Sequence, residues 1–301
     1  YQGHLSRREL AVEGLKTPLQ RYTYWSETAA NADYPVWWRH ANAQPTQRER
    51  LLDFESRAAA VDYLDLGDLA VSPDERWLAW TEDNRGDEFF DLYLLELPHG
   101  RPILLLSGIG AELCWAEDNR TLLFTRYDAT QRPASVWTIQ RDGSEPVQIY
   151  QEQDAEFWVG LGKTRSKAWL VLESASKDTS ECHLIPAHAP TAPLLCVRPR
   201  EPGVEYSLVH RPGHFYILHN RQSPHFRLDV ATETQPDDWQ PLIAHRDSHT
   251  LEAIDAFAWG LVITERDHDE AQVYLRVLEL SPDHEISDHR LPLPETPSSL
   301  M

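Results

Sequence analysis

Residues 69–97 read LAVSPDERWLAWTEDNRGDEFFDLYLLEL, and this stretch decides the fold. Its three apolar runs, 69–71, 77–81 and 89–97, are separated by polar segments, the first of which is opened by Pro73. Proline presets φ for a turn and cannot continue a strand ladder. Short apolar runs separated by turn residues are typical of an antiparallel meander. We therefore predict three consecutive β-strands here.

The same unit recurs along the chain. Its second strands are anchored 44 to 47 positions apart by Leu78, Leu122, Trp169, Tyr216 and Leu261. A period in this range, with three or four strands in each repeat, is what the blade of a β-propeller requires. The predicted fold class is therefore all-β: a β-propeller with about six four-stranded antiparallel blades, the first of them incomplete.

The repeats also predict the domain organisation. Residues 1–19 are polar and read as a linker, and residues 20–301 read as the propeller. The stretches 186–193, 197–203 and 236–246 read as connectors between blades, and no stretch has a strong helix pattern. The approximate blades are 20–66, 67–110, 111–155, 156–203, 204–249 and 250–297.

Composition excludes several classes of partner. No run of 18 or more apolar residues exists, so we expect no membrane partner. The formal net charge of −20 argues against nucleic acid, whose binding relies on Lys and Arg, and favours cationic ligands. Three cysteines without motif spacing, and a start without the apolar stretch of a secretory signal, predict a reducing, cytoplasmic location.

The motifs that resemble catalytic or metal sites are weak. Residues 160–164 (GLGKT) lack the first glycine of a phosphate loop and are not expected to precede a helix. The histidines form loose pairs without ligand spacing, such as His183 with His188. No Gly-x-Ser-x-Gly elbow occurs, although a serine–histidine–aspartate triad stays open on sequence grounds. We predict no catalytic residue, no cofactor and no metal.

One recurring acidic feature is a candidate binding site. A carboxylate stands at or just before the first strand of each clear repeat: Asp68, Glu112, Glu156, Glu205 and Glu252. First strands line the channel of a propeller, so these residues would form a ring at one mouth. At an effective dielectric of about 20, the attraction between one carboxylate and a unit positive charge about 4 Å away is worth roughly 4 kcal/mol. Such a ring would favour cationic peptides; the alternative is that these are ordinary turn residues.

Five stretches of the chain are distinctive in sequence. They are SPDERWLAWTEDNRGDEFFDLYLLEL (72–97), CWAEDNRTLLFTRYD (114–128) with RPASVWTIQRDG (132–143), FWVGLGKTRSKAWLVLESASKDTSE (157–181), PREPGVEYSLVHRPGHFYILHNR (199–221) and HRDSHTLEAIDAF (245–257). These stretches resemble the propeller domain of oligopeptidase B, a branch of the prolyl oligopeptidase family of serine peptidases. The resemblance runs in unbroken order from about Leu19 to Pro297.

The resemblance implies a seven-bladed propeller that caps an α/β-hydrolase domain and restricts access to short peptides, cut after arginine or lysine, mostly in the cytosol. Measured against that pattern, most of the N-terminal segment is expected to be missing before Tyr1, and the last blade and hydrolase domain after Met301. The family's catalytic residues therefore have no counterparts here. Open blade edges would promote self-association; a closed ring of six blades is the alternative.

Two functions follow as hypotheses. The first is a substrate-gating domain that takes basic oligopeptides, acts with a separate α/β-hydrolase domain and is inactive by itself. The second is a stand-alone propeller that binds a peptide or protein without catalysis. The chain lacks the Trp-Asp dipeptide of common scaffold propellers, since none of its eleven tryptophans is followed by aspartate.

Overall fold

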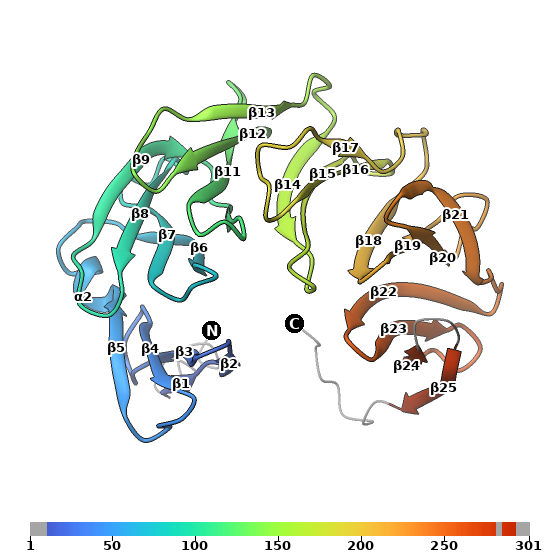
Figure 1. Ribbon diagram of the computed structural model, residues 1–301, viewed down its shortest axis with the longest axis horizontal. Coiled ribbons are helices and arrows are strands. Elements are labelled where there is room, and N and C mark those ends of the chain that lie inside the picture. Colours follow the sequence, from blue (N-terminus) through green and yellow to red (C-terminus); the bar gives the residue numbers. More distant parts are fainter. Residues whose placement is uncertain (1–10, 281–284, 293–301) are drawn as a thin grey trace. The chain divides into compact units, whose positions relative to one another are not determined.

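The computed structural model describes residues 11–280 and 285–292, and nearly all of its regular structure is β-strand (Figure 1). Its strands form six antiparallel sheets. Five sheets have four strands that pair in chain order, and the first has five short strands. The prediction of an all-β fold made of about six four-stranded antiparallel repeats is confirmed.

Each sheet takes its strands from one continuous stretch of chain. The first contains β1 (Val12–Glu13), β2 (Thr17–Pro18), β3 (Tyr22–Thr28), β4 (Val36–Ala41) and β5 (Arg48–Asp53). The second contains β6 (Asp65–Val71), β7 (Trp77–Asp83), β8 (Phe90–Glu96) and β9 (Ile103–Ile109). The third contains β10 (Leu113–Trp115), β11 (Thr121–Tyr127), β12 (Pro133–Gln140) and β13 (Val147–Gln151).

The other three sheets follow the same plan. The fourth contains β14 (Trp158–Lys163), β15 (Trp169–Ala175), β16 (Ser180–Pro186) and β17 (Leu195–Cys196). The fifth contains β18 (Tyr206–Arg211), β19 (His214–His219), β20 (Arg227–Thr232) and β21 (Gln235–Ile243). The sixth contains β22 (His249–Phe257), β23 (Gly260–Asp267), β24 (Gln272–Leu280) and β25 (Glu285–Pro292).

The chain divides into two compact units, which are described separately. One comprises Tyr1–Gln131 with Trp137–Gln148, and the other comprises Arg132–Val136 with Ile149–Met301. No helix in the described part of the chain is long and apolar enough to cross a membrane. The first ten residues of the predicted linker, and the predicted end of the last blade at residue 297, lie outside the described residues.

In the second, third and fifth sheets, the core lies on both faces of the second strand. In β7, the consecutive residues Leu78, Ala79 and Trp80 are all fully buried. Burial of neighbouring residues means that both faces of the strand are covered, which explains its continuous apolar run. In the first unit, Leu78 and Trp80 pack with Leu52 of the first sheet and with Phe54, which follows that sheet. Ala79 belongs to the next cluster, shared with the third sheet.

The hairpins between the first and second strands of the second, third and fourth sheets share one turn geometry. The residue before the turn donates its N–H across the hairpin, as Ser72 does to the carbonyl of Trp77 at 2.8 Å. All three turns contain a residue with positive φ: Glu75 (55°), Asn119 (60°) and Lys167 (62°). Asparagine tolerates this conformation better than most residues. The buried Glu75 carboxylate also accepts the N–H of Arg21 and so connects its turn to the first sheet.

The outer strands differ from the prediction. Residues 236–246, predicted to be a connector, contain most of β21, and β25 lies in the polar stretch after Leu280. More than half of the residues in β9, β13 and β21 are exposed. In β21 the exposed side chains leave no apolar run or alternation, so the sequence pattern does not reveal this strand.

Two smaller differences lie near the N-terminus. Residues 12–13 and 17–18, in the stretch predicted to be a linker, pair with β3. A short helix also forms although no stretch has a strong helix pattern: β5 ends at Asp53, and Phe54 begins α2 (Phe54–Ala58). The Asp53 side chain accepts the N–H of Ser56 and caps this helix, which is a favourable N-terminal arrangement.

Candidate functional site

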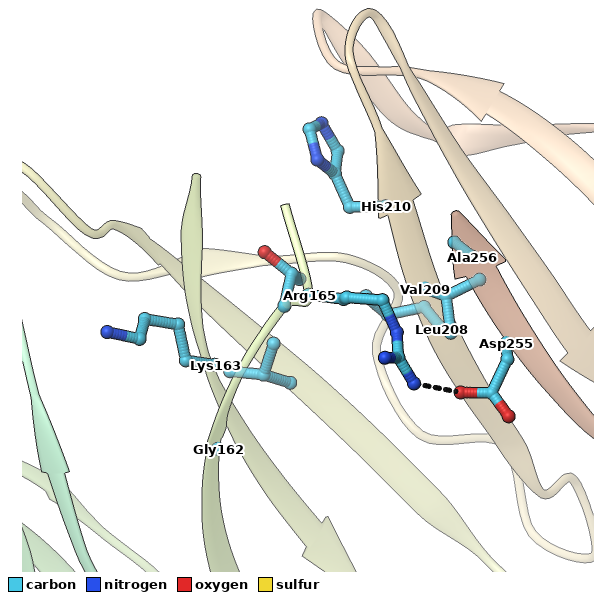
Figure 2. A pocket seen from close by; sticks show the side chains of 10 residues that line it. Gly162, Lys163, Arg165, Leu208, Val209, His210, Asp255 and Ala256 are labelled. Carbon is cyan, nitrogen blue, oxygen red and sulfur yellow. Dashed lines mark hydrogen bonds and ion pairs between the residues drawn. The ribbon is translucent and has the colours of Figure 1, made fainter. Parts of the chain in front are cut away.

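A pocket of about 530 Å³ opens among the first strands of the second unit (Figure 2). Its walls come from β14, β18 and β22 and from the turn after β14. Its charged lining residues are Lys163, Arg165 and Asp255. Arg165 and Asp255 form an ion pair at 2.9 Å, and both side chains are more than half exposed. The remaining lining residues are Gly162, Thr164, Val171, Leu208, Val209, His210 and Ala256.

The backbone of β14 shapes one wall of this pocket. A Cβ added at Gly160 or Gly162 would meet no atom within 4 Å, so both glycines border open space. The GLGKT motif does not form a phosphate loop, because β14 turns directly into β15 and no helix N-terminus follows it. Among the described residues that line the pocket, two side chains are cationic and one is a carboxylate, so these residues do not form an acidic site for basic peptides.

Beside this pocket, three side chains, two from turns and one from the end of β18, form a hydrogen-bonded chain. Ser166 Oγ lies 2.7 Å from His210 Nδ1, and His210 Nε2 lies 2.7 Å from a carboxylate oxygen of Glu233. His210 is buried, and burial lowers its pKa, although the hydrogen bond with Glu233 opposes this. The ring is therefore neutral at pH 7. The sequence left such a serine–histidine–acid arrangement open but did not locate it.

The geometry of this chain differs from that of a serine peptidase triad. There, the serine faces Nε2 and the acid faces Nδ1 of the imidazole, whereas the order is reversed here. Ser166 Oγ also accepts the N–H of Ala168, and the Glu233 carboxylate accepts the N–H of Gly213 at 2.7 Å. These bonds hold together the turns that follow β14, β18 and β20, so we assign the cluster a structural role.

A second polar cluster surrounds Glu152 in the same unit. Glu152 is 5% exposed and pairs with Arg200 at 2.6 Å. It also accepts hydrogen bonds from the hydroxyls of Ser174 and Tyr150 and from the N–H of Asp154. Burial alone would raise the pKa of Glu152, but the bonds from Arg200, Ser174 and Asp154 lower it to about 2. The carboxylate is therefore ionised at neutral pH.

Of the five predicted acidic residues, Asp68 and Glu252 lie within first strands and the other three lie just before them, and their surroundings vary. In the first unit, Asp68 is exposed in β6 and accepts the N–H of Leu113 at 3.1 Å. Glu112 is half-buried and immediately precedes β10. Asp68 therefore has a local structural role in addition to its charge.

The other three predicted acids belong to the second unit. Glu156 is exposed in the turn before β14. Glu205 precedes β18, and its carboxylate accepts the side-chain N–H of Asn220 at 3.2 Å. Glu252 lies within β22 and forms an ion pair with Arg266. Partners of this kind reduce the negative charge that an approaching ligand experiences. Because Glu156 is exposed, its substitution is the most direct test of the acidic-ring hypothesis.

The comparison with protein families decides the classification. The model of the prolyl oligopeptidase N-terminal β-propeller domain matches residues 10–299. The chain belongs to this family. The predicted resemblance to the propeller of this peptidase family is thus confirmed, and the six sheets are blades of a propeller domain.

Curated relatives of this prolyl oligopeptidase propeller are peptidases. The chain is 27% identical to dipeptidyl aminopeptidase BI of Pseudoxanthomonas mexicana over 265 residues, which cover 81% of this chain and 36% of that protein. It is 26% identical to Protease 2 of Moraxella lacunata over 276 residues, which cover 87% and 40%. The chain spans about two-fifths of the length of these relatives.

Solved structures show the same fold. Oligopeptidase B from Leishmania major matches with a TM-score of 0.86 and 21% identity, over 97% of this chain and 43% of that one. Oligopeptidase B from Trypanosoma brucei, with covalently bound antipain, matches with a TM-score of 0.86 and 23% identity, over 98% and 43%. At these identities the similarity establishes the propeller architecture.

Proposed function

We propose that this propeller is the substrate-gating domain of a serine peptidase and acts together with an α/β-hydrolase catalytic domain. The observation that carries the proposal is the family match over residues 10–299. The relatives are peptidases of which this chain matches about two-fifths, which leaves room in them for a second domain. In the described part of the chain, the serine–histidine–acid clusters Ser166–His210–Glu233 and Ser248–His249–Asp267 both place the serine at Nδ1 and the acid at Nε2, which is the reverse of a peptidase triad.

The proposed substrates are short peptides cleaved after arginine or lysine. Two features support this specificity: the structural similarity to oligopeptidase B and the net charge of −20. A strongly acidic protein attracts cationic ligands and raises their local concentration. The acidic residues at the first strands, which line the channel in propellers, would add to this attraction along the path of the substrate.

The test is a comparison of fluorogenic peptides in which only the residue before the scissile bond changes. The full-length protein that carries this propeller should cleave Arg and Lys substrates at least roughly 10-fold faster than a Pro substrate, since the rate ratio reports differential transition-state binding. The propeller alone should cleave none of them. Preference for proline, or release of N-terminal dipeptides only, would contradict the specificity. Turnover by the propeller alone would contradict the gating role.

A further inference from the structure

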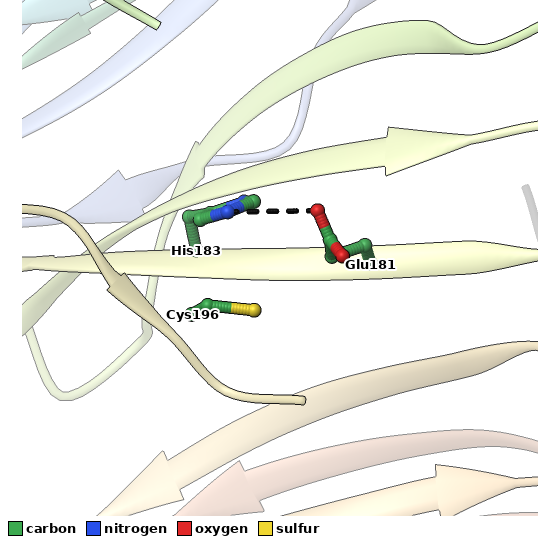
Figure 3. Close-up of side chains that lie close together, drawn as sticks. All are labelled: Glu181, His183 and Cys196. Atoms are coloured by element: carbon green, nitrogen blue, oxygen red, sulfur yellow. Dashed lines mark ion pairs between the residues drawn. The ribbon is translucent and has the colours of Figure 1, made fainter. Parts of the chain in front are cut away.

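Glu181, His183 and Cys196 bring oxygen, nitrogen and sulfur donors together in the fourth sheet (Figure 3). One donor atom from each residue lies within 4.8 Å of the other two. Glu181 and His183 are two apart on β16 and therefore share a face of the strand. Cys196 lies directly opposite His183 in the register of β16 with β17. The sheet itself thus fixes the three side chains.

The ring of His183 has no strong hydrogen bond to compete with a ligand. Nδ1 is buried and has no hydrogen-bond partner in the described part of the chain. Nε2 lies 3.6 Å from Glu181 Oε1, which is beyond the usual range of a hydrogen bond. The imidazole is held instead by the Tyr150 ring, at 5.0 Å between ring centroids.

We propose that Glu181, His183 and Cys196 bind a thiophilic divalent transition-metal ion, with Zn²⁺ as the best fit. Zinc takes cysteine, histidine and carboxylate ligands at about 2.0 to 2.3 Å in a tetrahedron. The Glu181–His183 separation is already near the spacing of two ligands in such a site. Cys196 must approach by a side-chain adjustment of about 1 Å, as judged from those bond lengths. Three protein ligands leave the fourth position for water.

The surrounding charges suit a doubly charged ion. Arg200 contacts Glu181 at 3.4 Å, but it is closer to Glu152, at 2.6 Å, and can remain there. Metal binding would form the Cys196 thiolate. The negative charges of this thiolate and of the Glu181 and Glu152 carboxylates would then balance the charges of the Arg200 guanidinium and Zn²⁺. The second oxygen of the Glu181 carboxylate accepts a hydrogen bond from the backbone N–H of Arg200 at 2.8 Å. This bond orients the carboxylate as outer-shell partners orient ligands in metal sites.

The metal would stabilise the weakest strand of the sheet. β17 has two residues and pairs with β16 only at the positions of Cys196 and Leu195. A metal ion that joins Cys196 to β16 would fasten this strand and the connection that precedes it. Since an ion that binds only the folded state raises stability in proportion to the logarithm of its free concentration, binding should be visible in unfolding curves.

Cobalt and zinc titrations of the purified chain, stripped of metal with a chelator, test this proposal. Co²⁺ should bind at one equivalent and give thiolate-to-metal charge-transfer absorption together with the visible bands of a tetrahedral site. Zn²⁺ should abolish both signals and raise the unfolding temperature. Absence of the thiolate signal in the wild-type chain would overturn the proposal without any variant.

Variants assign the ligands. Cys196→Ser and His183→Ala should each weaken binding by more than roughly 100-fold, because loss of an outer-shell partner alone costs 10- to 100-fold. Cys114→Ser is the matched control, since this half-buried thiol lies on β10 in the other unit and should leave binding unchanged. Retention of the charge-transfer band in Cys196→Ser, or its loss in Cys114→Ser, would overturn the assignment.

Discussion

His210 shows what a single buried side chain contributes to this fold. The residue is 3% exposed, yet both ring nitrogens are hydrogen-bonded, one to Ser166 and one to Glu233. The ring of Phe215 packs against it, with centroids 5.0 Å apart. Burial lowers the pKa of His210, Glu233 counteracts this, and the nearby His214 adds to the lowering. The folded protein therefore holds the imidazole neutral more strongly than the unfolded chain does.

This difference predicts acid sensitivity. A histidine in the unfolded chain binds its proton near pH 6.5, whereas folded His210 does so only at lower pH. Its contribution to stability is therefore complete above about pH 6.5, decreases as the pH falls below that value, and stops changing below the folded pKa. His210→Gln removes the titration. Denaturant unfolding at pH 8 and pH 5 should show a larger loss of stability in the wild type than in the variant.

Glu233→Gln is the companion variant for this measurement. It removes the carboxylate that raises the pKa of His210, so the acid-induced loss should become larger than in the wild type. An equal difference between wild type and His210→Gln at both pH values would show that His210 does not titrate in this way.

At the scale of the element, the hairpin between first and second strands links neighbouring sheets. In the first unit, the N–H of Asp74 donates to the side-chain oxygen of Asn119 at 2.7 Å, which joins two successive hairpins. In the second unit, Ser166 and His210 make the equivalent connection. Asn119 performs two tasks, because it also occupies the positive-φ position of its own turn.

Two substitutions at Asn119 separate these tasks. Asn119→Gly keeps the backbone conformation and loses only the hydrogen bond to Asp74, which should cost about 1 kcal/mol. Asn119→Ala loses the bond and keeps a Cβ at φ of 60° without the side-chain amide that lets asparagine tolerate this conformation, so the cost should rise to about 2 to 3 kcal/mol. Denaturant unfolding measures both. Equal costs for the two variants would mean that the backbone conformation carries no strain.

At the scale of the whole molecule, the feature to explain is the charge. The chain has 48 acidic residues and 28 lysines and arginines. In contrast, the described residues that line the pocket of the second unit include two cationic side chains and one carboxylate. The acidity therefore acts as a general field around the propeller, and the specific residues proposed to direct it are those at the first strands. Fields of this kind change rates of association most strongly at low salt.

Charge reversal of Glu156 tests this contribution. In the full-length peptidase, Glu156→Lys should lower kcat/KM for an Arg peptide by roughly 3- to 10-fold at low salt, and much less at high salt. Glu145→Lys is the matched control, because it makes the same charge change at an exposed position between the third and fourth strands of a sheet. Equal effects of the two variants would refute a special role for the first-strand acids.

Much of the architecture was predictable from residues alone. The second strands of the second, third and fifth sheets bury both faces, so Leu78–Trp80 and the equivalent residues leave continuous apolar runs, and the spacing of the second strands reveals the repeat. The outer strand β21 was missed for the opposite reason, because its exposed side chains leave no pattern. The acidic candidates could be placed at first strands, but their partners, such as Arg266 for Glu252, depend on strand register.

The amino-acid sequence by itself determined the repeat, the all-β class and the family, because these depend on apolar periodicity and on motifs that are continuous in the chain. Only the tertiary structure decided which side chains meet. Cys196 reaches His183 because two antiparallel strands pair in one register, and Ser166 reaches His210 because neighbouring hairpins pack together. Side-chain clusters of this kind join residues that are distant in the chain, and local pattern carries no record of them.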